Sequence, residues 1–573
     1  MKRFLLPGIA AALVFSLVLA CGSTGSAAGG MTPGTYRTEQ RGYVDQIKVE
    51  TVVDGSKIVS VRITENHETN GIGSFAIQWL PERIVQAQSV GIDIVSGASF
   101  SSRAILGSVT EALRQAGADV DKFSRPPPKP PARDQELSVD VIIVGAGGAG
   151  LTAGVEARVK GKDTLIIEKM DIPGGNTIRS SGGFNVAGSP EQVAARRGRY
   201  SIEDFITYTM EGGHNLNNRE LVTYMIQNSS GVVDWLKTQG MNPQIGETYA
   251  SYTVDGEAKG LILDLLRRYE SQGGKIMYGV RGTDIIMNGG RAAGIVAVDK
   301  LGGKLTIRAR AVILASGGFG GDLEMCARLD PSLEGFVTDN SLGATGDGIK
   351  MAEAIGAATV DMEQIQSHPT IHQASSTMLT EGIRGSGGIL INTAGKRFTN
   401  ENTYRDVVSA AILSQDQAKA CILFNKELMD HNPNVQGYYE QGLITPYNTL
   451  DDVARYMTVD PAVLKQTVAT WNTYVANKND PEFASSFSWI RDLSQGPYFA
   501  LWVAPGIHHT MGGIKINVRT EVLSAGGSTI PGLFACGEVT GGVHGGNRVG
   551  GNAILDILLY GRVAGENAAA YIR

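Results

Sequence analysis

Residues 139–169 read VDVIIVGAGGAGLTAGVEARVKGKDTLIIEK. A run of branched apolar residues leads into a glycine-rich turn, a helix-forming segment follows, and a second apolar run ends in an acidic residue. This order predicts a buried strand, a tight turn, a helix and a second strand parallel to the first. The stretch therefore predicts an α/β domain built on a parallel sheet.

Three glycines in this stretch have the spacing of the dinucleotide-binding fingerprint. Gly145 makes the turn, Gly147 lets the backbone approach a pyrophosphate, and Gly150 allows the helix to pack closely on the strand. Glu168 follows Gly150 by eighteen residues, which suits an acid that bonds a ribose hydroxyl. The helix N-terminus supplies N–H groups for the pyrophosphate. We therefore expect a dinucleotide to bind at this turn.

Later glycine-rich segments decide between a nicotinamide and a flavin. They are PGGNTIRSSGGFN (173–185), AVILASGGFGG (311–321) and GLFACGEVTGG (532–542). A flavoprotein with two dinucleotide folds needs such turns to wrap an extended FAD, whereas a nicotinamide domain has no use for the last one. We therefore predict non-covalent FAD. The residues of these segments expected to contact FAD are Gly175, Asn176, Gly183 and Gly317.

Residues 34–118 form a separate unit. Apolar residues alternate on both sides of an Asp-Gly pair in IKVETVVDGSKIVSVRITEN (47–66), which predicts a hairpin. A helix is expected over 101–118, with Ser101 or Ser102 as its N-cap. The linker 119–136 is rich in proline and should form a semi-rigid spacer. The prediction is a small α+β domain ahead of the α/β domain.

The N-terminus has the pattern of an export signal. Residues 1–21 contain two basic residues, a short apolar core and a small residue before Cys21, which predicts a secretory signal peptide. VLAC (18–21) resembles a bacterial lipobox, which implies a lipid on Cys21; the alternative is a plain cleaved signal. Residues 22–33 have the composition of a flexible tether. We expect export and attachment by the lipid alone to a bacterial membrane, facing the periplasm or the exterior.

Composition argues against several other classes. Net charge is −6 with scattered Lys and Arg, which argues against nucleic-acid binding. Cys326, Cys421 and Cys536 are isolated, which argues against a disulfide framework. No C-x-x-C-H is present, so covalent c-type haem is not expected. The pair His508-His509 lacks a third ligand at a usual spacing, so no metal site is predicted.

Five further segments make residues 137–573 resemble the fumarate reductase/succinate dehydrogenase flavoprotein family, most closely the soluble flavocytochrome c type of fumarate reductase. They are QSHPT (366–370), TMLTEGIRG (377–385), NTYRDVVSAAI (402–412), IHHTMGG (507–513) and GGVHGGNRVGGNAI (541–554). The resemblance implies an FAD-binding domain from two parts, 137–362 and 509–573. It also implies an inserted α+β capping domain, 363–508, that closes over the flavin.

The resemblance also implies a site for fumarate, a flat dianion. His509 and Arg548 are expected to hold one carboxylate. His368 and Thr380 are expected to hold the other, with help from the backbone at Glu381. A guanidinium fork binds a carboxylate through two parallel hydrogen bonds, which suits Arg548 to this role. Twisting the second carboxylate out of conjugation would make the double bond more electrophilic.

In this family, hydride comes from FAD N5 and the proton from the arginine of the T-x-R-D motif, here Arg405. An arginine ordinarily keeps its proton, so this step needs a strongly basic carbanion and immediate replacement of the proton. Glu381 and Arg384 are spaced i and i+3, and they form the expected relay. The residues implied at the flavin are His508, Glu538, Asn552, Ala553 and Ile554.

A second flavin is implied in the N-terminal unit. DIVSGAS (93–99) resembles the flavinylation motif of FMN-binding domains, and ENHETNGIG (65–73) resembles their second motif, with Asn70 where Pro is more common. The resemblance implies that a flavin transferase attaches FMN through its phosphate to Ser99, with Ser101 as the fallback. This FMN would replace the N-terminal haems of the flavocytochromes.

The expected function is a reductase that passes electrons from an external donor to FMN, then FAD, then fumarate. The donor would be a membrane quinol, a cytochrome system or a flavin carrier. Alternatives are reduction of another α,β-unsaturated acid (urocanate, acrylate, methacrylate or a cinnamate) and succinate oxidation, for which no iron–sulfur partner is indicated. A tethered flavin carrier without its own substrate is the alternative from another class, and it leaves Arg405 and Arg548 unexplained.

Overall fold

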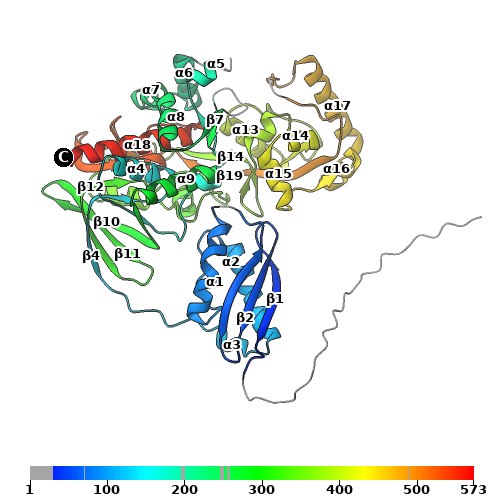
Figure 1. Cartoon of the computed structure of the whole chain (residues 1–573). Coiled ribbons are helices and arrows are strands. Elements are labelled where there is room, and N and C mark those ends of the chain that lie inside the picture. The colour runs from blue at the N-terminus through cyan, green and yellow to red at the C-terminus, as the bar shows by residue number, and fades with distance from the viewer. Residues whose placement is uncertain are drawn as a thin grey trace, which may run out of the picture.

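The computed structural model describes residues 30–572, except 70, 195–200, 246–250, 255–257 and 488–489. The expected signal peptide, Cys21 and most of the tether lie outside the described residues. Figure 1 shows a small N-terminal domain in blue, a large α/β domain in green completed by a red C-terminal helix, and a third body in yellow and orange. Within the described part, no helix is long and apolar enough to cross a membrane.

The N-terminal domain is a three-stranded antiparallel sheet in the order β1-β2-β3, with two long helices packed on it. The hairpin formed by β2 and β3 turns at Asp54, whose carboxylate accepts hydrogen bonds from the backbone of Ser56 and Lys57. Its elements are β1 (Gly34–Arg41), β2 (Gln46–Val53), β3 (Ile58–Glu65), α1 (Gly73–Ala87), α2 (Ser99–Gln115) and α3 (Val120–Phe123).

Helix α2 begins at Ser99, two residues before the expected start. The expectation that Ser101 or Ser102 caps this helix is therefore wrong, because both are buried inside its first turn. Ser102 Oγ instead donates to Ala98 O (2.8 Å) and accepts from Val95 N (3.2 Å), so it ties the preceding loop to the helix from within. Ala98 is the N-cap and makes no side-chain hydrogen bond.

The α/β domain is built on the parallel strands β22-β12-β4-β5-β9, and β10 and β11 extend the sheet in antiparallel fashion beside the first half of β12. The proline-rich spacer runs from 124 to 134, so the domain starts at Gln135. The strands of this sheet are β4 (Gln135–Val144), β5 (Thr164–Glu168), β9 (Lys275–Tyr278), β10 (Val280–Asn288), β11 (Arg291–Asp299), β12 (Lys304–Leu314), β21 (Glu521–Leu523) and β22 (Thr529–Ala535).

Two helices pack against each other beside this sheet, α4 (Gly148–Val159) and the C-terminal α18 (Asn552–Tyr571). Gly150 shows why the fingerprint needs its third glycine. A Cβ at this position would lie 1.9 Å from Gly145 O, so any larger residue would push the helix off the strand. The other elements of this domain are β6 (Phe184–Asn185), α5 (Pro190–Ala194), α6 (Ile202–Gly212), α7 (Arg219–Gln227), α8 (Ser229–Thr238), β7 (Pro243–Ile245), β8 (Ser251–Val254), α9 (Ala258–Ser271), α10 (Leu323–Leu329), α11 (Asp347–Glu353), β13 (Thr359–Val360), β20 (Gly513–Lys515) and β23 (Thr540–Gly541).

The third body is a sheet in the order β15-β14-β19-β17-β16, covered by helices. Its long strand β19 runs through the expected boundary at 508/509, so the strand belongs to both bodies. The elements are β14 (Ile365–His372), β15 (Thr377–Met378), α12 (Glu381–Gly385), β16 (Ile389–Ile391), α13 (Arg405–Leu413), β17 (Ala420–Asn425), α14 (Lys426–Asp430), α15 (Pro433–Glu440), β18 (Pro446–Tyr447), α16 (Leu450–Met457), α17 (Pro461–Asn477) and β19 (Tyr498–Thr510).

Antiparallel pairing of β14 with β19 brings two of the sequence motifs together. Gln366 lies opposite His509, and His368 lies opposite Gly506. The QSHPT and IHHTMGG segments are therefore neighbours in one sheet, although about 140 residues separate them in the chain.

Candidate active site

A deep pocket opens at the carboxyl ends of β4, β5, β12 and β22, where ligands bind in sheets of this kind. Its empty volume is about 1180 Å³, including the part open to solvent. The lining runs from the turn at Gly145 to His508 and Arg548.

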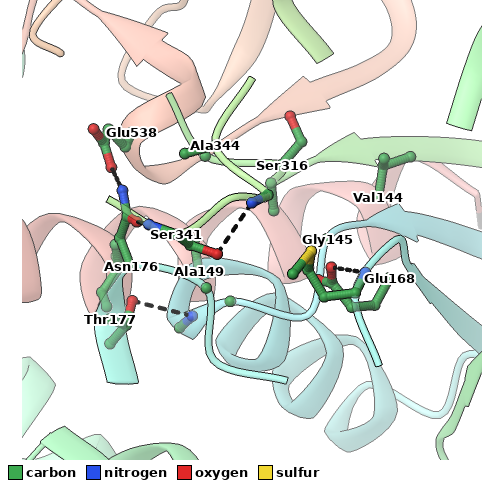
Figure 2. Close-up of a pocket in the computed structure, with 18 of the residues that line it drawn as sticks. Val144, Gly145, Ala149, Glu168, Asn176, Thr177, Ser316, Ser341, Ala344 and Glu538 are labelled. Carbon is green, nitrogen blue, oxygen red and sulfur yellow. Dashed lines mark hydrogen bonds between the residues drawn. The ribbon is translucent and has the colours of Figure 1, made fainter. Parts of the chain in front are cut away.

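The first end of the pocket fits a pyrophosphate and a ribose. Gly147 caps α4 without a side chain, which leaves the first turn of the helix open to a phosphate. Figure 2 shows Thr177 beside this turn, where its hydroxyl accepts from Gly148 N (3.3 Å). Glu168 accepts from Ala146 N (2.8 Å), and burial raises the pKa of its carboxyl. A Cβ added to Gly317 would meet nothing within 4 Å, so this lining residue leaves free space for a ligand.

The other end of the pocket holds a polar cluster around Glu538. Asn176 Nδ2 donates to Glu538 Oε2 (3.0 Å), as Figure 2 shows, and Thr510 N donates to Glu538 Oε1 (3.0 Å). Burial raises the pKa of the Glu538 carboxyl. Ala553 and Ile554, in the first turn of α18, also line this end. The N-terminus of α18 favours negative charge on a bound flavin.

Most residues expected to contact FAD line this pocket. Those in the lining are Gly145, Gly147, Glu168, Gly175, Asn176, Gly317, His508, Glu538, Ala553 and Ile554. Gly150, Gly183 and Asn552 lie outside it. Gly150 packs against the strand, and Asn552 is fully buried, where it donates to Thr209 Oγ1 (3.2 Å) and accepts from Asn185 Nδ2 (2.8 Å). Ser341 and Ala344 also line the pocket, and no motif marked their loop.

Beyond the Glu538 end, Arg405 and Glu381 form a paired cluster. Each is the first residue of a helix, α13 and α12. Arg405 donates from Nε to Glu381 Oε1 (2.6 Å) and from Nη2 to Glu381 Oε2 (2.8 Å). Arg384 Nη2 lies 3.8 Å from Glu381 Oε1 and is itself buried. The structure thus brings together the three residues expected to move the proton.

Gln366 is a residue that the sequence reasoning missed. Its Oε1 accepts from Arg405 Nη1 (2.8 Å), while its Nε2 donates to Arg548 O (2.9 Å) and Asn547 Oδ1 (2.6 Å). It therefore sets the spacing between the two arginines. Its place two residues before His368 on a strand was the available signal, because alternate residues of a strand share one face.

Arg548 is buried, and no acidic side chain among the described residues pairs with it within salt-bridge distance. Its Nη2 donates to His508 Nε2 (3.0 Å), and its Nε has no partner in the same part of the chain. Burial, with Arg405 nearby, lowers the pKa of Arg548 to about 9, which still leaves it charged at neutral pH. A buried guanidinium without a carboxylate partner is costly, so an anionic ligand would stabilise it.

Two histidines complete this end of the site. His508 Nδ1 bonds Asp339 Oδ2 (2.7 Å), and its ring lies 5.1 Å from that of His368. His368 is fully buried, with Nε2 unpartnered among the described residues. Burial lowers the pKa of both rings, more so for His368, where Arg405 adds to it. Both are therefore neutral at pH 7: His368 can donate a hydrogen bond from Nε2, whereas His508 bonds Asp339 through Nδ1 and accepts from Arg548 at Nε2.

His509 follows His508 on β19 and also lines the pocket. Its Nδ1 lies 3.5 Å from Glu538 Oε1, and its ring packs edge-on against His544 at 5.4 Å. From the sequence we expected His509 at the substrate and His508 at the flavin. That assignment stays a prediction: His508 uses both ring nitrogens for Asp339 and Arg548, whereas the buried Nε2 of His509 has no partner among the described residues.

Thr380 lies at the N-cap of α12, where its Oγ1 accepts from Gly382 N (3.3 Å). Its backbone N donates to Tyr438 Oη (3.0 Å), and Tyr438 Oη donates to Met378 O (3.0 Å). Tyr438 therefore holds the TMLTEG segment in place from α15. Nothing in the sequence marked this tyrosine.

Glu381 offers a test of the paired cluster. Burial alone would raise the pKa of Glu381, but Arg405 outweighs it and holds the pKa well below the ordinary 4.5. Its stabilising effect is thus complete above about pH 4.5 and is lost as pH falls through the lower, folded-state value. We expect Glu381→Gln to lower the free energy of unfolding by about 2 kcal/mol at pH 7, less than a fully buried pair would because the carboxylate is partly exposed.

Denaturant unfolding at pH 7 and at pH 4 or below measures the difference in free energy of unfolding between the unaltered chain and Glu381→Gln. This difference should be smaller at the lower pH. Glu334→Gln, at an exposed site, is the matched control and should change little at either pH. A difference that widens on acidification would contradict the assignment.

Comparison with known proteins agrees with this geometry. The family model for the FAD binding domain matches residues 140–554, and that for the FMN-binding domain matches 42–114. The NADH:fumarate oxidoreductase of Klebsiella pneumoniae is 34% identical over 94% of this chain, which spans 59% of that relative's length. The urocanate reductase of Eggerthella lenta is 32% identical over 99% of both chains.

Among solved structures, the open conformation of a flavocytochrome c3 fumarate reductase aligns with a TM-score of 0.64 and 36% identity, over 76% of this chain and 79% of that one. The two matched domains confirm the expected FAD and FMN cofactors. The chain belongs to the fumarate reductase/succinate dehydrogenase flavoprotein family, as an FAD-dependent oxidoreductase with an FMN-binding domain ahead of its FAD-binding domain.

Proposed function

We propose that this chain reduces the double bond of fumarate to succinate. The observation that carries the proposal is the buried Arg548, which has no acidic partner among the described residues and stands beside two neutral histidines. Arg405 is the second guanidinium of the site, and its charge is already balanced by Glu381. The site therefore has an unbalanced positive charge and several free donors, which match a small dianion.

We infer that His509 and Arg548 hold one carboxylate, while His368 and Thr380 hold the other with the backbone at Glu381. His508 bonds Asp339 through Nδ1 and accepts from Arg548 at Nε2, so it positions that guanidinium. A dicarboxylate would satisfy the Nε2 atoms of His368 and His509 and the Nε of Arg548, which are buried without partners among the described residues.

When bound, FAD supplies the hydride at N5. Arg405 donates the proton that the second carbon requires, so one hydride and one proton convert fumarate to succinate. A proton then passes from Arg384, whose Nη2 lies 3.8 Å from Glu381 Oε1, through the Glu381 carboxylate to Arg405, with which Glu381 shares two hydrogen bonds, and solvent returns a proton to Arg384. Glu381 is ionised at neutral pH because its pKa lies well below 4.5, so it passes the proton on and does not store it.

The main alternative is reduction of another unsaturated acid. The name of the Eggerthella relative, which aligns over nearly its whole length, favours urocanate. A urocanate site must accept an imidazole in place of the second carboxylate. His368 and Thr380 with the backbone at Glu381 suit a second carboxylate better, so fumarate remains the preferred substrate.

We propose that electrons arrive through FMN attached to Ser99. Ser99 is the first residue of the 17-residue helix α2, where free N–H groups stabilise a phosphate. Ser99 is half-buried, whereas Ser101 is buried and hydrogen-bonded to Glu68 of the His-Glu-Thr motif. Glu68 also accepts from Tyr43 N (2.8 Å), so Ser101 has a structural role that a flavin there would disrupt.

We also propose, on the sequence alone, that the chain is exported and lipid-anchored at Cys21. A flavin transferase would mature it, and a quinol, cytochrome or flavin carrier outside the chain would supply the electrons.

Replacing Arg405 tests the catalytic role. We expect Arg405→Ala to lower kcat for fumarate by about 10²–10⁴-fold, the range for a lost general acid, while FAD stays bound. Fumarate-dependent oxidation of reduced methyl viologen measures turnover, and flavin absorbance measures FAD content. Arg455→Ala, at an exposed arginine of the same body, should leave both unchanged. Turnover near normal in Arg405→Ala with FAD bound would favour the carrier alternative.

Mass spectrometry of a tryptic digest tests the second flavin. In a host that flavinylates proteins, the peptide that ends at Arg103 should carry one FMN, Ser99→Ala should abolish it, and Ser101→Ala should retain it. An unmodified peptide from such a host would contradict attachment at Ser99. Loss of FMN only in Ser101→Ala would place the attachment at Ser101. The same digest shows whether the mature chain begins at a lipid-modified Cys21 or retains the residues before it.

A further inference from the structure

The N-terminal domain contacts the α/β domain through the loop that precedes Ser99. Ser96 N, within this loop, donates to Asp171 Oδ2 (2.8 Å). Asp171 belongs to the α/β domain, is only 7% exposed, and pairs with Lys300 at the end of the β11–β12 hairpin. Burial would raise the pKa of Asp171, but Lys300 and the Ser96 amide outweigh it, so the carboxyl stays ionised. One buried carboxylate thus joins a loop of each domain.

Apolar contacts surround this polar link. Gly97 has a φ of +99°, and a Cβ added there would lie 2.6 Å from Ile172 Cδ1, so the loop lies flat against the α/β domain. A Cβ added to Gly71, in the second FMN motif, would lie 3.0 Å from Ile178 Cδ1. Both motifs of the N-terminal domain therefore contact one segment, 170–178.

Aromatic rings extend the contact on one side. Trp79 of α1 packs against Phe75 (4.8 Å between ring centroids) and against Tyr278 of the α/β domain (6.1 Å). Tyr278 ends β9, directly opposite Glu168 in the sheet. The N-terminal domain therefore lies against the strands that carry the FAD site, as the position of the blue domain in Figure 1 also indicates.

Segment 170–178 has two faces with different roles. Its outer face holds Asp171, Ile172 and Ile178 against the N-terminal domain. Met170, Gly175, Asn176 and Thr177 of the same segment line the FAD pocket. A single loop therefore separates the flavinylation motif from the pocket.

We propose that Asp171 and Lys300 form a latch that holds the FMN-bearing loop on segment 170–178, and that this docked contact is the path from FMN to FAD. The inference rests on the proposed attachment of FMN to Ser99. The linker 124–134 keeps the domains together, whereas the latch fixes their orientation. In each transfer, the FMN hydroquinone loses two electrons and two protons, the protons pass to solvent, and FAD gains the two electrons with protons from solvent.

Hydrogen exchange tests docking without any dependence on turnover. In the full chain with both flavins bound, the Ser96 amide should be protected, and Asp171→Ala should speed its exchange at least about tenfold. A tenfold change corresponds to about 1.4 kcal/mol, and losing one member of a buried pair costs more. Lys300→Gln, at a more exposed side chain, should do the same without disturbing the pocket, while Lys304→Gln is the matched control on the neighbouring strand.

Single-turnover kinetics tests the electron path. Both flavins are reduced chemically, excess reductant is removed, and the protein is mixed with fumarate. FAD should reoxidise first and FMN more slowly, through FAD. Asp171→Ala and Lys300→Gln should slow only the second phase, again by about tenfold or more, and Ser99→Ala should lack it.

The outcomes separate the proposals. Rapid exchange at Ser96 in the unaltered chain would overturn docking. Faster exchange of the Ser96 amide in Asp171→Ala, with an unchanged rate of FMN reoxidation, would contradict the proposed electron path. An unmodified Ser99 peptide, or the absence of any reoxidation by fumarate in every variant, would instead count against the proposed function, since Ser96 protection needs neither the flavin nor the substrate.

Discussion

The active site depends on a charge imbalance in a buried place. Arg405 has its carboxylate partner in Glu381, but Arg548 has no carboxylate within salt-bridge distance among the described residues. An uncompensated buried cation is costly. A bound anionic substrate would offset this cost by pairing with Arg548. The low pKa values of His368 and His508 fit the same account, because further positive charge here would add to the cost.

The capping body and the α/β domain each contribute residues to the active site. Arg405, Glu381, His368 and Thr380 come from the capping body, whereas Arg548 and the FAD pocket belong to the α/β domain, and β19 is shared by both. Gln366 bridges the two arginines by accepting from Arg405 and donating to the backbone of Arg548. The N-terminal domain then meets the α/β domain at segment 170–178, so the proposed FMN site and the FAD pocket share one loop. The order of the domains in the chain thus follows the direction proposed for electron flow.

Sequence reasoning recovered the parts of this structure that depend on local pattern. The dinucleotide turn, the hairpin at Asp54, the proline-rich spacer and the five motifs all rest on residues close together in the chain. It failed where the answer depends on how distant segments pair. His508 and His509 are adjacent on β19, and only the folded structure shows that His508 lies beside His368. The start of α2 at Ser99 depends on Ser102 bonding back to the preceding loop, and Asp171 gains its role only when two domains meet.

We propose that this site is built for a second carboxylate, which a comparison of substrates can test. The purified chain with both flavins, supplied with reduced methyl viologen, should show a kcat/KM for fumarate at least about 10²-fold above those for urocanate and acrylate. The reason is that a site built to hydrogen-bond one group strongly rejects molecules that lack it. Equal or greater kcat/KM with urocanate or acrylate would contradict the account.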